Sequence, residues 1–183
     1  MSDKYKIIDS AEPHFVTFTV VGWIDIFSRE YYKEIITESL QYCTAEKGLI
    51  LNAWIIMTNH IHLIIRSNDT NLSSLVRDIK KYTSKQIVNA IKLNSKESRK
   101  NWLIKMFECE NFNLNKSQEY QFWRKGYHPV CLSTENMINQ RLNYLHENPV
   151  KSGLVWESWH YKYSSAIDYY TNEKGLLTIE KIE

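Results

Sequence analysis

Two histidines stand two residues apart in the run Asn59-His60-Ile61-His62-Leu63. In a β-strand, residues i and i+2 point to the same face, so the two imidazoles would lie side by side while Ile61 and Leu63 turn into a core. Two neighbouring imidazoles can hold one metal ion. The alternative is a pair of ordinary sheet histidines, hydrogen-bonded or solvated, and the H-x-H spacing alone does not decide between the two.

A tyrosine and an asparagine form a second candidate pair. Tyr144 and Asn148 are four residues apart in a segment, 134–148, that is predicted to be a helix ending at Pro149. Both would lie beside the apolar stripe of this helix, which consists of Ile138, Leu142 and Leu145. Neighbours one turn apart can face a common groove at the edge of a sheet. Taken singly, each also fits an ordinary structural role, as a boundary tyrosine and as a helix-terminal asparagine.

Positive charge is concentrated in one segment. The net charge of the 183 residues is only +2, yet between positions 77 and 105 only Asp78 and Glu97 oppose the lysines and arginines. Apolar residues recur at helical spacing over 72–91, with the basic residues on the other faces. Such a helix is suited to binding a polyanion, although a merely solvated helix face has the same pattern.

The elements that position these residues follow from hydrophobic periodicity. Strands are expected over 14–21, 49–57, 60–66 and within 121–133, and helices over 28–48, 72–91 and 134–148. The second and third strands form a hairpin. This order predicts an α+β fold: a ferredoxin-like sandwich whose central antiparallel sheet has helices on one face. Residues 94–120 are expected to be a variable insertion with a short strand near 102–107.

Composition excludes several classes of protein. With 43% hydrophobic and 13% aromatic residues, the chain is not intrinsically disordered, and we expect a single domain over 1–183. The three cysteines form no C-x-x-C pair, so neither a disulfide framework nor a cysteine zinc site is expected. Apolar runs are strand-sized and no signal peptide is evident, which predicts a soluble, cytoplasmic protein with no membrane partner.

Together these motifs resemble the single-tyrosine HUH transposases, which include the transposases of the smallest insertion sequences and the repeat-associated tyrosine transposases. The Asn59–His62 element is similar to the HUH motif, and residues 144–155 resemble the tyrosine helix. Segment 72–85 and the Phe122-Trp123 pair before Gly126-Tyr127-His128 also match. The resemblance covers residues 12–165, leaving 166–183 as a tail. It departs from the family at Thr58, where proline is usual, and in the longer segment 94–120.

The resemblance implies a metal-dependent endonuclease and strand transferase for single-stranded DNA at hairpin or palindromic repeats. It implies that Tyr144 attacks a phosphodiester to give a 5′-phosphotyrosine, and that His60, His62 and Asn148 bind Mg²⁺ or Mn²⁺. The HUH motif would lie on a central strand and the tyrosine on a C-terminal helix. DNA phosphates would contact Arg77, Lys80, Lys81 and Lys85, and Trp123 or Tyr127 are candidates for base stacking, although core packing is the alternative for Trp123.

Two other functions stay open at this point. A catalytically silent, domesticated relative would bind hairpin DNA without cutting it. A hydrolase of small phosphoesters could use His60 and His62, although acidic ligands are lacking nearby. The sequence also leaves open whether the protein acts as a monomer or a homodimer, because relatives do both. We expect a DNA-processing protein of this kind to be associated with the nucleoid in the cytoplasm.

Overall fold

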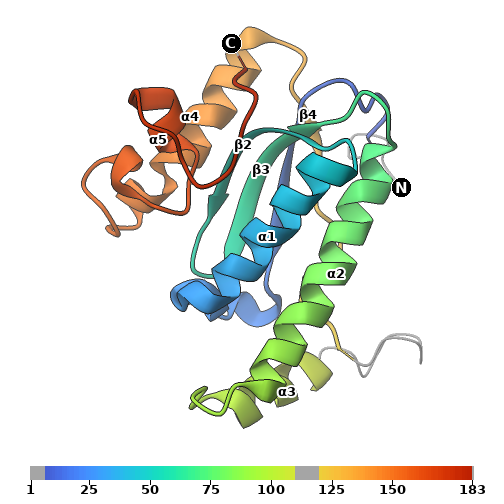
Figure 1. Cartoon of the computed structure of the whole chain (residues 1–183), viewed down its shortest axis with the longest axis vertical. Coiled ribbons are helices and arrows are strands. Elements are labelled where there is room, and N and C mark those ends of the chain that lie inside the picture. Colours follow the sequence, from blue (N-terminus) through green and yellow to red (C-terminus); the bar gives the residue numbers. More distant parts are fainter. Residues whose placement is uncertain (1–6, 110–119, 183) are drawn as a thin grey trace.

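The computed structural model describes residues 7–109 and 120–182. Its sheet contains four strands: β1 (His14–Thr19), β2 (Ile50–Ile56), β3 (His60–Arg66) and β4 (Val130–Cys131). They lie in the order β2-β3-β1-β4, and each neighbouring pair is antiparallel. This is the strand order of a ferredoxin-like unit. The predicted α+β class with a central antiparallel sheet is therefore confirmed, and β3 is an interior strand (Figure 1).

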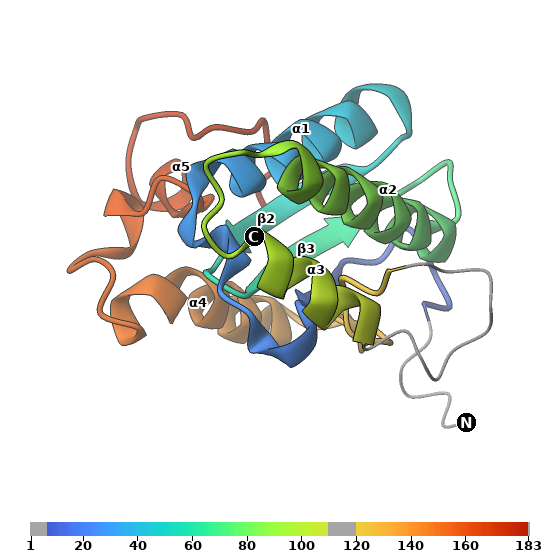
Figure 2. The ribbon, with the colours of Figure 1, turned by 90° about the horizontal axis from the view of Figure 1, so that it is seen from below.

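Two long helices cover one face of the sheet. They are α1 (Glu30–Glu46), which follows the short 3-10 turns Val21–Trp23 and Ile26–Ser28, and α2 (Leu72–Leu93). Figure 2 shows both helices on the same side of β2 and β3. Their buried faces pack on alternate strand residues such as Phe18, Ile61 and Leu63 to form the larger core. Asn71 caps α2 by accepting a hydrogen bond from the backbone N–H of Ser74 at 3.0 Å.

The other face of the sheet is covered as well, which corrects the expectation of helices on one face. Helix α4 (Glu135–Lys151) lies across the sheet from α1 and α2 (Figure 2). Its apolar stripe forms a second, smaller core with residues of three strands, namely Phe15, Ala53, Ile55 and Ile64. The physical reason is that these strands are apolar on both faces at this end, so each face needs a covering layer.

Three predicted boundaries also differ. Helix α4 continues through Pro149 to Lys151, because a proline in the last turn removes only one helical hydrogen bond. Residues 102–107, expected as a strand, belong to helix α3 (Lys100–Cys109), and the rest of the expected insertion, 110–119, lies outside the described residues. The strand expected within 121–133 is reduced to β4, since Gly126 and His128 have φ values of 78° and 39°, which interrupt extended backbone.

The C-terminal segment packs beside α4 and β2 (Figure 1). It contains a short 3-10 turn, Ser158–His160, and helix α5 (Ala166–Tyr170). The backbone N–H groups of Ser165 and Glu180 donate to the carbonyls of Trp54 and Leu51, at 2.9 Å each. Over the described ranges, no helix combines the length and the apolar character that crossing a membrane requires.

Candidate active site

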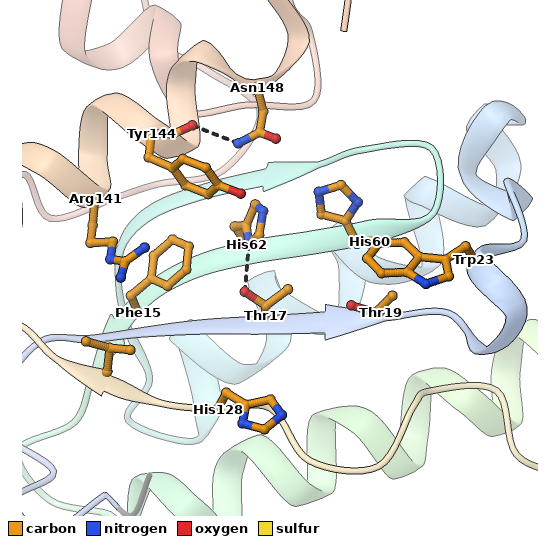
Figure 3. A pocket seen from close by; sticks show the side chains of 11 residues that line it. Phe15, Thr17, Thr19, Trp23, His60, His62, His128, Arg141, Tyr144 and Asn148 are labelled. Atoms are coloured by element: carbon orange, nitrogen blue, oxygen red, sulfur yellow. Dashed lines mark hydrogen bonds between the residues drawn. The ribbon is translucent and has the colours of Figure 1, made fainter. Parts of the chain in front are cut away.

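A pocket of about 410 Å³ opens between α4 and the strand face beneath it, and it collects residues from distant parts of the chain. Both predicted histidines line it from β3, and Tyr144 and Asn148 line it from α4 (Figure 3). The rest of the lining comes mainly from β1 and the segments flanking the strands: Phe15, Thr17, Thr19, Trp23, His128, Val130 and Arg141. The two candidate pairs identified from spacing alone therefore share one cavity.

The position of the proton on the His60 ring follows from its hydrogen bond to Asn59. The ring centroids of His60 and His62 are 4.7 Å apart. Asn59 Nδ2 donates to the carbonyl of Trp23 at 3.3 Å, which fixes Asn59 Oδ1 as the amide atom facing His60 Nδ1, at 2.6 Å. A carbonyl oxygen only accepts, so His60 Nδ1 carries the proton and Nε2 keeps its lone pair. The second nitrogen of His60 is thus available as a ligand atom.

His62 is held by the opposite strand. Thr17 lies directly across from it in the β1–β3 register, and Thr17 Oγ1 is hydrogen-bonded to His62 Nδ1 at 2.8 Å. The residue is only 5% exposed, and its Nε2 has no hydrogen-bond partner among the described residues. A buried ring nitrogen without a partner is unfavourable. When Nδ1 donates to Thr17 Oγ1, Nε2 carries the lone pair and can bind a metal. The remaining nitrogen of His62 is therefore also a candidate ligand atom.

Both imidazoles are neutral near pH 7. Burial lowers the pKa of His60, and burial lowers the pKa of His62 to about 3, with smaller contributions from His60 and Arg141. A protonated imidazole has no lone pair to give to a metal, so the depressed pKa values keep both residues in the form that can bind one.

Tyr144 reaches the same place from α4. Its ring centroid is 5.4 Å from that of His62 and 6.1 Å from that of Phe15, and Tyr144 is 43% exposed. Figure 3 shows the hydroxyl pointing toward the two imidazoles. Asn148 Nδ2 donates to the carbonyl of Tyr144 at 2.7 Å, which leaves Asn148 Oδ1 as an accepting atom. A phenol that can contact substrate thus shares one pocket with three candidate ligand atoms.

These donors fit a divalent metal ion. Two imidazole nitrogens and one amide oxygen form an incomplete set, which leaves positions for water or substrate oxygens. The unpartnered Nε2 of His62 is the observation that supports the fit. Within the described ranges, no group of three or more His, Cys, Asp and Glu side chains is arranged to hold a metal.

Seven of the eleven residues that line the pocket were not predicted as site residues, and they include Arg141, Thr17 and Trp23. Arg141 places its guanidinium over the Phe15 ring, 5.2 Å from the centroid, and adds a permanent positive charge. It precedes Tyr144 by three residues, a helical spacing that could have revealed it. Thr17 and Trp23 have no such spacing in the sequence. Thr17 faces the pocket because of the strand register, and Trp23 reaches it through a turn with positive φ.

The four predicted DNA-binding residues divide into two groups. Lys81 and Lys85 are exposed on α2, and exposed Arg77 pairs with its neighbour Asp78 at 3.2 Å. Lys80 Nζ instead donates to the carbonyls of Arg124 and Gly126, at 3.0 and 2.7 Å. Its ammonium ties α2 to the segment before β4, so a phosphate contact is not its evident role. All four lie on α2, which is across the sheet from α4 (Figure 2).

Two further side chains have structural roles. Trp123 is 5% exposed, and its Nε1 donates to Thr83 Oγ1 at 3.1 Å, so core packing explains it and base stacking does not. His146, which follows Tyr144 by two residues, is fully buried, and its Nε2 is hydrogen-bonded to Ser165 Oγ at 2.9 Å. It faces away from the pocket and does not act as a base for the Tyr144 hydroxyl.

Solved structures include two that are similar to this chain. A solved structure of a REP-associated tyrosine transposase bound to a REP hairpin is similar in fold, with a TM-score of 0.64 and 18% identity over 100% of this chain and 99% of that one. A candidate transposase from Deinococcus radiodurans R1 has a TM-score of 0.42 and 16% identity over 79% of this chain and 95% of that one. No curated protein matches the chain in sequence.

The sequence profile of the IS200-like transposases matches residues 9–107, more than half of the chain. The matched range includes both histidines of the pocket and ends before α4. The chain therefore belongs to the IS200-like transposase family.

Proposed function

We propose that this protein is a metal-dependent endonuclease and strand transferase for single-stranded DNA, acting at hairpin or palindromic repeats through Tyr144. The observation that supports this most strongly is the meeting of Tyr144 with the His60–His62 pair in one pocket. Membership in a transposase family indicates the substrate class. A structure of similar fold is that of a protein bound to a REP hairpin, which is why hairpin DNA is the proposed partner.

His60 Nε2, His62 Nε2 and Asn148 Oδ1 would hold the metal. A bound Mg²⁺ or Mn²⁺ would polarise a phosphate oxygen and orient the scissile group. Imidazole suits Mn²⁺ better than Mg²⁺, so Mn²⁺ is the better match to this donor set. Asn59 and Thr17 orient the imidazoles through their Nδ1 atoms, as outer partners of metal-binding histidines usually do.

Tyr144 would supply the nucleophile. Its hydroxyl oxygen forms a bond to the DNA phosphorus and the bond from phosphorus to the 3′-oxygen breaks, leaving a 5′-phosphotyrosine and a free 3′-hydroxyl. The phenolic proton passes to solvent, and the departing 3′-oxygen takes one up. A later 3′-hydroxyl attacks the same phosphorus and releases Tyr144, so the bond energy is kept for rejoining. Arg141, whose charge is permanent, would neutralise the phosphate in the pocket.

DNA that leaves the pocket can reach α2 past the segment before β4. Arg124 and Lys125 are exposed in that segment, and Lys80 holds its backbone against α2. Arg77, Lys81 and Lys85 would then contact phosphates further along the hairpin. Contacts of this kind would weaken as salt concentration rises.

The ring centroids of Tyr144 and His62 lie 5.4 Å apart within one molecule, which supports a site built from a single chain. We therefore infer that the tyrosine acts in cis. An equimolar mixture of His60→Ala and Tyr144→Phe proteins should stay inactive at every concentration. Recovered cleavage in the mixture would show that the tyrosine comes from a partner chain and would overturn the cis assignment.

The proposed activity is tested with hairpin-bearing single-stranded DNA and Mn²⁺ or Mg²⁺. The wild-type protein should cut the DNA and form a covalent adduct that survives denaturing electrophoresis. Tyr144→Phe should lose the adduct, and His60→Ala should lose cutting. Matched controls are Tyr42→Phe and His160→Ala, both at exposed positions outside the pocket, which should behave as wild type.

The outcomes separate the candidate functions. A Tyr144→Phe protein that cuts as well as wild type would overturn the nucleophile assignment. A wild-type protein that binds hairpins but is inert with every divalent metal would indicate the catalytically silent alternative. Turnover of a small phosphodiester in the absence of the Tyr144 hydroxyl would indicate the hydrolase.

A further inference from the structure

The pocket extends past the histidines to an exposed tryptophan. Trp23 lines the pocket and is 56% exposed, and its ring meets that of His60 edge-on, with 6.3 Å between centroids (Figure 3). Large aromatic rings usually bury most of their surface, so a half-exposed tryptophan at the rim of the pocket needs an explanation.

Trp23 is held at the pocket by a backbone conformation that is unfavourable for a residue with a side chain. Its φ is 55°, directly after Gly22 at 61°. A bulky residue rarely adopts this left-handed region. Among the described residues, only Trp23 and His128 combine a positive φ with a side chain, and both line this pocket. Strain of this kind concentrates at functional sites, where the surrounding structure maintains it.

Specific contacts hold the strained turn in place. The backbone N–H of Trp23 donates to the carbonyl of Val20 at 3.1 Å, and its own carbonyl accepts from Asn59 Nδ2 at 3.3 Å. Asn59 is the same residue that orients His60. The position of the indole is therefore coupled to that of a candidate metal ligand through one side chain.

A cation accompanies the ring. The guanidinium of Arg124 lies over Trp23, 5.5 Å from its centroid, and the Arg124 backbone is anchored by a hydrogen bond from its N–H to the carbonyl of Thr19 at 2.8 Å. An exposed indole with a cation beside it combines the two features that bind single-stranded nucleic acid, a π-face for a base and a positive charge for the backbone.

We propose that Trp23 and Arg124 form a base-stacking subsite for the nucleotide next to the phosphate bound at His60 and His62. The indole stacks on the base and the guanidinium contacts the neighbouring phosphate. The proposal rests on the proposed function in one respect, namely that the ligand is single-stranded DNA. It assigns the stacking role to Trp23, whereas Trp123 belongs to the core.

The test compares two probes that differ only in their bases. One is an oligothymidine of about fifteen nucleotides and the other is its fully abasic counterpart, so that both carry the same phosphates. Binding is measured without divalent metal in a Tyr144→Phe background, which removes cleavage. Trp23→Asn removes the indole while keeping a residue that tolerates a positive φ, so the turn is preserved.

Trp23→Asn should weaken oligothymidine binding by roughly 5- to 150-fold, the range expected for one base–aromatic stack, and should leave the abasic probe unaffected. Trp23→Phe should recover part of the loss. Arg124→Gln should weaken both probes and reduce the salt dependence by about one counterion. Trp156→Asn is the matched control, since Trp156 is 93% exposed and lies outside the pocket, and it should bind as wild type.

The proposal is overturned if Trp23→Asn keeps the preference for oligothymidine, or if both probes weaken equally, or if the unmutated pocket binds neither probe. The outcome of this test does not depend on whether Tyr144 is the nucleophile. A protein that forms the Tyr144 adduct but shows no base preference at Trp23 would refute only the stacking subsite. A protein that forms no adduct but loses its base preference in Trp23→Asn would support the subsite and refute the catalytic proposal.

Discussion

Replacing Thr17 with valine tests how the candidate metal site is oriented. Thr17 lies opposite His62 across β1 and β3, and its hydroxyl is hydrogen-bonded to His62 Nδ1 at 2.8 Å. Valine keeps the β-branched shape that suits a strand and removes only the hydroxyl. Because His62 is only 5% exposed, bulk water does not readily replace the lost partner.

The expected effect can be estimated in two ways. Leaving a buried polar atom without a partner costs about 1–3 kcal/mol. Removing the outer partner of a metal-binding histidine typically weakens metal affinity about 10- to 100-fold, or about 1.4–2.7 kcal/mol. The two ranges agree. The Mn²⁺ concentration needed for half-maximal cleavage should therefore rise 10- to 100-fold in Thr17→Val.

The assay is cleavage of a hairpin-bearing oligonucleotide over a Mn²⁺ titration. Because Thr17 orients a ligand and does not hold DNA, saturating Mn²⁺ should restore the wild-type rate. Thr17→Ser keeps the hydroxyl and should need little more Mn²⁺ than wild type. The reasoning fails if Thr17→Val is activated at the wild-type Mn²⁺ concentration, or if its defect persists at saturation.

Three further variants test other parts of the structure. Asn71→Ala removes the cap of α2 and should cost about 1 kcal/mol in urea unfolding, with wild-type DNA binding. Burial lowers the pKa of His146 to about 3, so the unfolded chain binds a proton there below pH 6.5 while the folded chain does not. His146 alone should thus lower stability by about 2 kcal/mol between pH 7 and pH 5, in addition to the losses from His60 and His62. His146→Gln should lose that much less than wild type over this range, and an equal loss in the two proteins would refute the assignment. Lys80→Ala should lower the free energy of unfolding by about 1–2 kcal/mol, whereas Lys81→Ala should leave stability unchanged and reduce the salt slope of DNA binding by about one.

The local parts of the site were predictable because they depend on short-range periodicity. The two-residue alternation of a strand places His60 and His62 on one face, and the four-residue spacing of a helix places Tyr144 and Asn148 on another. The hairpin over 49–66 was predicted for the same reason and is confirmed as β2 and β3. Neither argument requires knowledge of which elements pack together.

The parts that were missed depend on relations between distant residues. Thr17 bonds His62 only because of the register between strands 45 residues apart in sequence. Trp23 reaches the pocket through a positive φ that no propensity would assign to tryptophan. Lys80 resembled its exposed neighbours in sequence, but its ammonium is used by two carbonyls from a segment some forty residues away. Residue type and spacing carry no information about such contacts.

The location of the site follows from a change in composition along two strands. On the face toward α4, the cross-strand pairs of β1 and β3 run from Phe15–Ile64 to Thr17–His62 and then to Thr19–His60. The apolar stripe of α4 packs on the apolar end, and the two polar pairs beyond it line the pocket. Tyr144 and Asn148 flank that stripe, so burying the stripe carries both side chains to the boundary where the polar pairs begin. The same burial that stabilises α4 therefore brings the Tyr144 phenol to the imidazoles. A variant in which the apolar Phe15–Ile64 pair stood at the next cross-strand position would shift α4 away from the two histidines.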